Sequence, residues 1–247
     1  MLNLKKILKI IIITLVWLLI WEAIHLIVHK DILVPSPVSV FLKIIEMAGQ
    51  ADFWASIGTS ILRILIGYTA AVLIGSIIGI GTALSKVLNS FLAPLSRIIR
   101  ATPVASFIIL LFVFLSRNHI PAVTAFLIVL PIVWANVYEG IKNTDTQLLE
   151  MAKVFRLSRS SILKNIYIPQ IKPFFMASVK TGMGLAWKAG IAAEVLTNPT
   201  YGIGSGLYNS KIYLETTELF AWTAVIIIIS VLLEKAFAAL INALSKN

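Results

Sequence analysis

The sequence predicts an all-α membrane protein that crosses the bilayer about six times. Of its 247 residues, 59% are hydrophobic and only 13% are charged, whereas about a quarter of a soluble domain is charged. Segments 64–85 and 118–138 contain no charged residue, and each reaches the roughly 20 residues that cross a hydrocarbon core as a helix. Backbone polar groups in lipid must be satisfied within the element, and these runs do not alternate as barrel strands do, so we expect helices.

Six spans within a single domain of residues 1–247 account for the apolar segments. We expect them at about 8–28, 60–84, 98–116, 119–138, 172–195 and 218–240. The first follows Lys5, Lys6 and Lys9 and is similar to a signal peptide, but no Ala-x-Ala-type cleavage site follows it. We therefore interpret it as a retained span.

The distribution of positive charge orients these spans. With the N-terminus inside, 15 of the 21 Lys and Arg residues fall in the N-terminus, the 85–100 loop, the 139–180 region and the C-terminus. Cytoplasmic segments carry such an excess, so we expect both termini in the cytoplasm. Because the net charge of +10 is placed in this way, it does not indicate a nucleic-acid partner.

The region between the first two spans predicts an ordered external turn. Residues 34–37 read Val-Pro-Ser-Pro and precede an amphipathic stretch to about Met47. Proline fixes φ and disfavours helix just before it, so a short interfacial helix should follow the turn. In the second span, Gly75 and Gly79 form a small-xxx-small face that permits close helix approach. Packing within the chain is the favoured interpretation, and a dimer seam is the alternative.

The chain lacks the patterns of an enzyme. It has no cysteine, and His25, His29 and His119 are too scattered to suggest metal ligands. The glycine-rich segment 198–206 is no phosphate loop, because no strand precedes it and no Lys-Ser/Thr follows. It predicts a tight external turn, with docking of an external protein as the alternative. The sequence also shows neither a Ser/His/Asp set nor paired intramembrane carboxylates. Because it has no phosphate-binding loop, the chain should not hydrolyse ATP itself.

A polar, basic interruption at 144–169 predicts two short cytoplasmic helices. Thr144 or Asp145 can cap a helix through about Phe155, and Ser158 can cap a second one ending near Pro169. An apolar stripe at helical spacing runs along the first helix: Leu148, Leu149, Ala152 and Phe155. Such a helix lies on the membrane or fills a partner's groove. The turn, the second cap and the proline favour a docking element.

Four residues of this loop match a Glu-Ala-Ala, Ile and Leu-Pro signature: Glu150, Ala152, Ile166 and Pro169. Met151 and Ile168 are mild replacements within it. The segment resembles the cytoplasmic coupling loop of bacterial ABC-importer permeases, the surface that the ATP-hydrolysing subunit grips. Arg156 stands where that family usually has glycine. A left-handed turn would cost a Cβ-bearing residue about 1 kcal/mol or more, so either the turn is right-handed or the partner tolerates the arginine.

The resemblance runs from Pro35 through the final span and is strongest to permeases of the sulfonate, taurine and nitrate type. These also carry Pro-Ser-Pro after the first span and a Gly-x-Gly external turn, matched here by Gly202 and Gly204. The resemblance implies a permease subunit of an ATP-driven importer in the bacterial cytoplasmic (inner) membrane. Its solute would be small and anionic, such as a sulfonate, taurine or nitrate. Carriers of thiamine precursors or another small nutrient belong to the same class and are the alternative.

The resemblance also implies the partners. They are separate ATP-binding-cassette ATPase subunits that hold ATP and Mg, an extracytoplasmic substrate-binding protein, a second permease copy and membrane lipid, with no cofactor in this chain. The loop residues expected to couple to the ATPase are Glu150, Ala152, Phe155, Arg156, Ser158, Ile166 and Pro169.

The fifth span contains the candidates for a substrate path. Lys188 lies within it beside Trp187, and Glu194 follows six residues later. An ionisable group at membrane depth is a functional candidate by default, so Lys188 could attract an anion in a watery path. In the alternative, Lys188 snorkels outward or neutralises Glu22 or Glu194.

Two other function classes remain as rivals. An ion-driven secondary transporter would need ionisable relays and usually a longer repeated architecture. An intramembrane enzyme would need a convergent catalytic set, which the sequence lacks.

Overall fold

The computed structural model describes residues 4–245, and within that range every regular element is a helix. This confirms the predicted all-α class. The first three residues and the last two, and with them Lys246, lie outside the described part. The helices are α1 (Leu4–Val28), α2 (Pro37–Ala48), α3 (Ala51–Leu84), α4 (Lys86–Ala101), α5 (Val104–Leu111), α6 (Ile120–Lys142), α7 (Thr146–Val154), α8 (Arg159–Ile162), the π-helical turn η1 (Leu163–Tyr167), α9 (Ile168–Thr197), α10 (Ile203–Ile212) and α11 (Thr216–Ser245).

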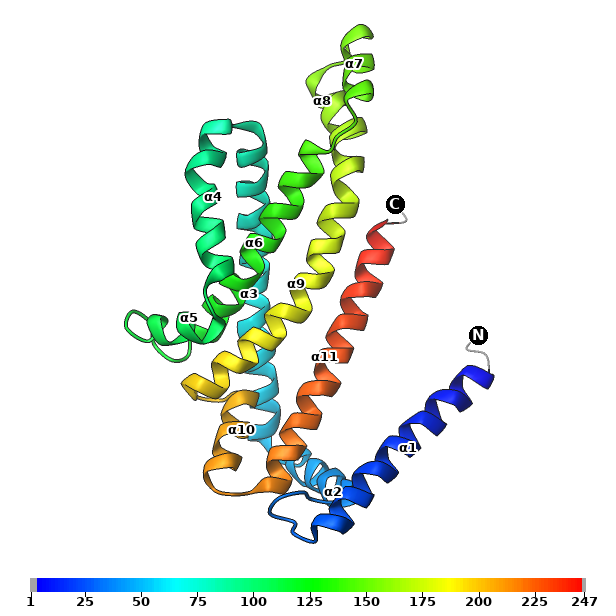
Figure 1. Ribbon diagram of the computed structural model, residues 1–247, viewed down its shortest axis with the longest axis vertical. Coiled ribbons are helices and arrows are strands. Elements are labelled where there is room, and N and C mark those ends of the chain that lie inside the picture. Colours follow the sequence, from blue (N-terminus) through cyan, green and yellow to red (C-terminus); the bar gives the residue numbers. More distant parts are fainter. Residues whose placement is uncertain (1–3, 246–247) are drawn as a thin grey trace.

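The long helices form an elongated bundle (Figure 1). Helices α3, α6, α9 and α11 run along its length, with α7 and α8 projecting at one end and α2 and α10 at the other. Four helical segments are long and apolar enough to cross a membrane: Ile11–Val28, Ala51–Leu84, Ile120–Lys142 and Thr216–Ala239. The bent pair α4 and α5 would make a fifth. The count of six stays a prediction, since the lysines and glycines of α9 lower its hydropathy.

The segment expected as the third span, 98–116, contains a sharp bend between two helices. α4 ends at Ala101, α5 begins at Val104, and their axes differ by 102°. Pro103 explains the break, because its ring fixes φ and it has no N–H for the ladder. The expected 85–100 loop is likewise a helix, which Ser85 caps by accepting a hydrogen bond from the backbone N–H of Leu88. Arg97 and Arg100 therefore lie on a helix that packs against α3 and α6.

A seam of glycines brings α3 against α6. A Cβ at Gly67 would overlap the backbone of Ala122, and one at Gly79 would lie 2.8 Å from the Trp134 carbonyl oxygen. Gly75 meets α6 between these two positions. The favoured interpretation of the Gly75/Gly79 motif, packing within the chain, is thus confirmed. Where the helices touch, the Trp134 indole also donates a hydrogen bond to Thr82 Oγ1 at 2.9 Å.

Helix α1 contacts the rest of the chain near its C-terminal end. The Trp21 indole donates to the Pro35 carbonyl oxygen at 3.1 Å, and its ring packs 5.8 Å from Phe220. The expected turn follows, where Ser36 caps α2 by accepting a hydrogen bond from the Ser39 N–H. The rest of α1 extends away from the bundle (Figure 1), and none of its span window is buried. Its apolar surface is left for lipid or another chain.

Replacing Gly67 with alanine should separate α3 from α6. Overpacking a close helix contact costs about 1–3 kcal/mol, so Gly67→Ala should lower the unfolding temperature of the purified protein in detergent. Gly58 on the same helix is the matched control, because a Cβ there meets nothing within 4 Å. Gly58→Ala should be neutral or slightly stabilising. Equal unfolding temperatures for the two variants would contradict the packing described.

Candidate functional site

The predicted 144–169 loop forms a shaped projection beyond the ends of α4 and α11 (Figure 1). Its first helix, α7, begins where Asp145 Oδ1 accepts a hydrogen bond from the Gln147 N–H at 2.8 Å. This confirms one of the two predicted caps. The Asp145 N–H in turn donates to Gln170 Oε1 at 2.9 Å. The start of α7 is therefore held to the start of α9.

Arg156 ends α7 in the left-handed conformation, with φ 51°. Its N–H donates to the Lys153 carbonyl at 3.1 Å, and the Leu157 N–H donates to the Ala152 carbonyl at 2.9 Å. These two bonds make a Schellman motif, which satisfies carbonyls that the helix end would leave unpaired. Of the two alternatives for Arg156, the right-handed turn is excluded. The arginine occupies a conformation that suits glycine.

The second helix does not end near Pro169 as expected. Ser158 caps α8 as predicted, its Oγ accepting from the Ser161 N–H at 3.2 Å. From there α8, η1 and α9 follow one another without a gap. Pro169 lies in the first turn of α9, where a missing N–H costs little. The proline thus marks the junction of the loop with α9 and does not stop a helix.

Two buried apolar residues anchor the projection, whereas the side chains on its outer surface are exposed. Ala152 is 0% exposed and Ile166 is 4% exposed. By contrast, Val154 is 79% and Phe155 71% exposed. Glu150 is exposed as well, and among the described residues it has no hydrogen-bond or ion-pair partner. Four exposed cations surround this apolar tip: Lys153, Arg156, Arg159 and Lys164. Exposed apolar surface with a charged rim is typical of a protein interface.

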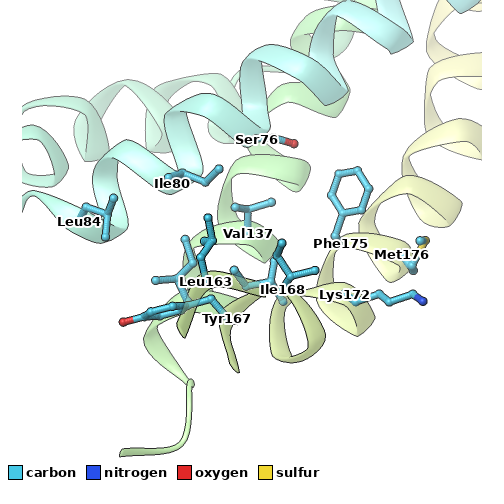
Figure 2. Close-up of a pocket in the computed structure, with 12 residues that line it drawn as sticks. Ser76, Ile80, Leu84, Val137, Leu163, Tyr167, Ile168, Lys172, Phe175 and Met176 are labelled. Carbon is cyan, nitrogen blue, oxygen red and sulfur yellow. The ribbon is translucent and has the colours of Figure 1, made fainter. Parts of the chain in front are cut away.

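A cavity of about 790 Å³ lies at the foot of the projection (Figure 2). It is bounded by the end of α3, by α6, by η1 and by the start of α9. Leu163 and Tyr167 of η1 face it from one side, and Ile80 and Leu84 of α3 from the other (Figure 2). The lining is almost entirely apolar. The projection therefore joins the bundle beside an open, apolar space between η1 and α3.

Of the three predicted path residues, Trp187 and Glu194 share the buried face of α9, and Lys188 lies on another face. Trp187 is 1% exposed, and its indole N–H donates to the Ile226 carbonyl of α11 at 3.3 Å. Glu194 is fully buried, whereas Lys188 is exposed. The exposed stripe that contains Lys188 consists of Thr181, Leu185, Lys188 and Ala192. In this conformation only Lys188 of the three is open to its surroundings.

Glu194 organises a buried polar cluster at the end opposite the projection. Its Oε2 accepts hydrogen bonds from Ser60 Oγ at 2.7 Å and from the Gly204 N–H at 3.1 Å. Ser60 Oγ also accepts from the Ile203 N–H at 2.9 Å. The first turn of α10 is thereby held to α3 and α9. Position 204 requires glycine, because a Cβ there would collide with Glu194 and with the backbone that follows it.

Arg63 completes this cluster. Its guanidinium lies 3.6 Å from Glu194 Oε1 and donates to the carbonyls of Tyr201 and Thr200 at 2.6 and 2.8 Å. Glu194 is therefore paired with Arg63 and not with Lys188. Within the described chain, Oε1 accepts no hydrogen bond. The hydrogen bonds from Arg63 hold the 198–202 turn in a tight conformation.

The sequence analysis missed Ser60 and Arg63 as partners of Glu194. A signal for Arg63 was present, because it is an ionisable residue inside the predicted second span. No local signal pointed to Ser60, since its contact with Glu194 joins residues 134 positions apart.

A charged corner lies near this end, where α2 meets α11. Lys43 Nζ is 2.9 Å from Glu46 and 3.7 Å from Glu218. The hydrogen bond to Glu46 raises the pKa of Lys43, and a hydrogen bond to Glu218 together with its charge raises the pKa of Glu215. Exposed pairs of this kind add little stability. They align α2 with α11.

The described residues contain no group of acidic, His or Cys side chains suited to a metal ion.

Comparisons with known proteins agree on one family. The family model described as "Binding-protein-dependent transport system inner membrane component" matches residues 71–247. The taurine transport system permease protein TauC of Escherichia coli is 26% identical over 226 residues, which cover 89% of this chain and 82% of that protein. The nitrate import permease protein NrtB of Synechococcus elongatus is 30% identical over 205 residues, covering 78% and 73%.

A solved structure supports the fold. The MetNI methionine ABC transporter in an inward-facing conformation matches with a TM-score of 0.61 at 13% identity, covering 77% of this chain and 93% of that one. At this identity the likeness concerns the fold alone.

Replacing Arg156 with glycine should stabilise the end of α7. The change removes a Cβ from a left-handed residue and should gain up to about 1 kcal/mol, seen as slower hydrogen exchange of the Leu157 amide. Arg159→Gly is the control, because Arg159 is in right-handed helix and glycine there should be destabilising. Faster Leu157 exchange in Arg156→Gly would contradict the assigned turn.

Replacing Glu194 with alanine should weaken the fold strongly. Removal of one partner of a buried pair costs about 3–5 kcal/mol, because Arg63 would lose its counterion and the Ser60 hydroxyl and Gly204 N–H their acceptor. Thermal unfolding in detergent measures the loss. Glu46→Ala, which removes a carboxylate that is 60% exposed, should cost less than about 1 kcal/mol. If the two variants unfold at the same temperature, Glu194 does not hold α10 in place.

Proposed function

The chain belongs to the family of binding-protein-dependent transport inner membrane components, the permease subunits of ABC importers, and from this premise we propose that it conducts a small anionic solute. The subunit is not an enzyme, and in this family ATP hydrolysis takes place on a separate subunit. It is a multi-pass protein of the bacterial inner membrane. In the proposed orientation both termini and the 144–169 projection face the cytoplasm, as the distribution of Lys and Arg suggests.

The observation that carries the proposal is the projection formed by α7, α8 and η1. It exposes Val154 and Phe155 at its tip and presents Glu150 without a partner among the described residues. We propose that an ATP-binding-cassette ATPase grips this surface, with ATP and Mg on that subunit. The residues proposed to couple to the ATPase, by contact or by shaping the surface, are those of the matched signature and its flanks: Glu150, Ala152, Phe155, Arg156, Ser158, Ile166 and Pro169.

Ala152 and Ile166 would act from below this surface. Both are buried, so they would hold the shape of the projection and not touch the ATPase. Because α6 leads into the projection and α9 leads out of it, a displacement of the projection would reach both helices. Such a change drives transport only if nucleotide favours one of two conformations.

The solute class follows from the relatives and from Lys188. The relatives are named for taurine, nitrate, bicarbonate and aliphatic sulfonates, all of which carry an oxyanion group. Lys188 presents a positive charge on the exposed stripe of α9. We propose that this stripe borders a path formed with a second copy of the chain, to which an extracytoplasmic binding protein delivers the solute. Trp187 and Glu194 would support α9 from inside the bundle.

Copurification in mild detergent tests the proposed assembly directly. An ATPase subunit should accompany this chain, and proteoliposomes that contain both, with the binding protein, should accumulate solute only when ATP is supplied. Uptake without nucleotide would favour an ion-driven carrier. Thermal shift of the binding protein against sulfonates, nitrate, bicarbonate and thiamine precursors would identify the solute.

Loss of the Glu150 carboxylate should weaken coupling to the ATPase. Loss of one partner of an interfacial charge pair costs about 2–5 kcal/mol, so Glu150→Ala should lower ATPase affinity at least about tenfold. Pull-down and substrate-stimulated ATP hydrolysis measure this. Glu46→Ala, at the other end of the molecule, should leave both unchanged. Normal stimulated hydrolysis in Glu150→Ala would refute the assigned role.

Loss of the Lys188 charge should slow uptake of an anionic solute. In a site shielded from water an attracting charge raises local anion concentration roughly tenfold or more, so Lys188→Ala should reduce uptake by a similar factor. Lys211→Ala removes an exposed charge from α10 and serves as the control. An unchanged rate for the anion in Lys188→Ala would reject the path role.

A further inference from the structure

Arg100 is an exposed residue near the end of α4 that contacts α6 at about the middle of that helix. Its guanidinium donates a hydrogen bond to the Pro131 carbonyl oxygen at 2.7 Å. Pro131 is inside α6, a candidate span that runs from Ile120 to Lys142. Eleven residues separate it from the first residue of that helix, which is about 16 Å at 1.5 Å per residue. Since the hydrocarbon core is about 30 Å thick, Arg100 meets α6 near the bilayer midplane.

An arginine at this depth in the membrane is unfavourable unless its surroundings or its function compensate for the cost. Intramembrane arginine costs a few kcal/mol even on insertion scales, and such residues face a protein interior or a watery cavity. Arg100 is the last residue but one of α4, directly before the 102° break at Thr102 and Pro103. Broken helices at the midplane are where transporters place their solute and ion sites. The position of Arg100 therefore points to a polar cavity.

Two adjoining cavities open beside Arg100 in the crevice between α4 and α6. The first, of about 490 Å³, is lined by Thr102 and Asn136 together with apolar side chains. The second, of about 270 Å³, is lined by Arg97, Tyr138 and Glu139 among others. Arg100 and Ala135 line both. The two cavities thus follow each other along the crevice, from the middle of α6 toward its end at Lys142.

The charges in this crevice favour an anion. Its titratable lining consists of two guanidinium groups, one carboxylate and one phenol: Arg97, Arg100, Glu139 and Tyr138. Arginine offers five N–H donors arranged to bind oxyanions in pairs. In the described part of the chain, Arg100 uses its guanidinium for the single bond to Pro131. The remaining donors can bind a solute while that bond holds the side chain in position.

We propose that the α4–α6 crevice is an anion-binding segment of the translocation path, in which Arg100 binds the oxyanion group of the solute and Arg97 attracts it onward toward the cytoplasmic end. This inference rests on the proposed transport function and adds a site to it. Lys188 lies on a different helix, α9, and lines neither cavity. The solute class is a small oxyanion, such as a sulfonate, nitrate or bicarbonate.

The chain has no cysteine, so a single cysteine at Ala135 reports on the crevice without background. The probes are sulfonatoethyl methanethiosulfonate, which is anionic, and trimethylammonioethyl methanethiosulfonate, which is cationic. The quantity measured is the ratio of their labelling rates in phosphatidylcholine vesicles, relative to the same ratio at Tyr213→Cys, which is exposed on the external side. Because both probes react with the same thiolate, the ratio is independent of any change in the pKa of the cysteine.

The proposal predicts that the anionic probe is favoured at Ala135→Cys and that Arg100→Gln lowers the ratio about tenfold or more. Arg100→Lys should retain most of the preference, and nitrate, sulfate and taurine should slow the anionic probe. Lys86→Gln removes one charge from the exposed start of the same helix and should leave the ratio unchanged. Unaltered labelling of Tyr213→Cys in the Arg100 variants shows that they are folded.

Three results would overturn the proposal. They are no labelling of Ala135→Cys by either probe, a ratio that Arg100→Gln does not change, and protection by added phosphatidylglycerol without any by nitrate, sulfate or taurine. The last would assign Arg100 to a lipid headgroup. None of these measurements uses an ATPase or nucleotide, so failure of the crevice and failure of the ATP-driven assembly are detected separately.

Discussion

The close contact of α3 with α6 is the constraint on which the rest of the structure depends. Gly67, Gly75 and Gly79 let the two backbones meet where any side chain would intervene, and this gives the bundle a stiff centre. α3 carries Ser60 and Arg63 at one end, where they hold α10. α6 leads at the other end into the projection that exposes Val154 and Phe155. The closely packed α3–α6 pair therefore connects the projection to the Glu194 cluster at the other end.

The sequence was sufficient for features that depend on local chemistry. Caps at Asp145 and Ser158 follow from short-range hydrogen bonding, and the helical class follows from composition. The sequence was insufficient for features that depend on the three-dimensional arrangement of the helices. The extension of α4 back to Lys86 removed the predicted 85–100 loop, because a run that contains charged residues between two apolar segments resembles a connection. Pro169 was read as a stop, although proline fits equally well in a first helical turn.

Three ionisable groups on helices α4 and α9 have different surroundings, and sequence alone could not separate them. Glu194 is paired with Arg63 and bonded to Ser60 and Gly204, so its role is to fix α10. Lys188 is exposed on the outer face of α9. Arg100 is held by a backbone carbonyl beside two adjoining cavities. Contacts between distant residues decide each case, and only Lys188 and Glu194 had been singled out from the pattern of charges.

Accessibility of a single cysteine at Val154, the most exposed of the large hydrophobic side chains on the projection, tests the central claim most directly. The account predicts that a membrane-impermeant maleimide labels Val154→Cys in inside-out vesicles but not in intact cells, and that bound ATPase protects the cysteine. Labelling from outside intact cells, or labelling at the same rate with and without the ATPase, would contradict the claim that this projection is the cytoplasmic docking surface.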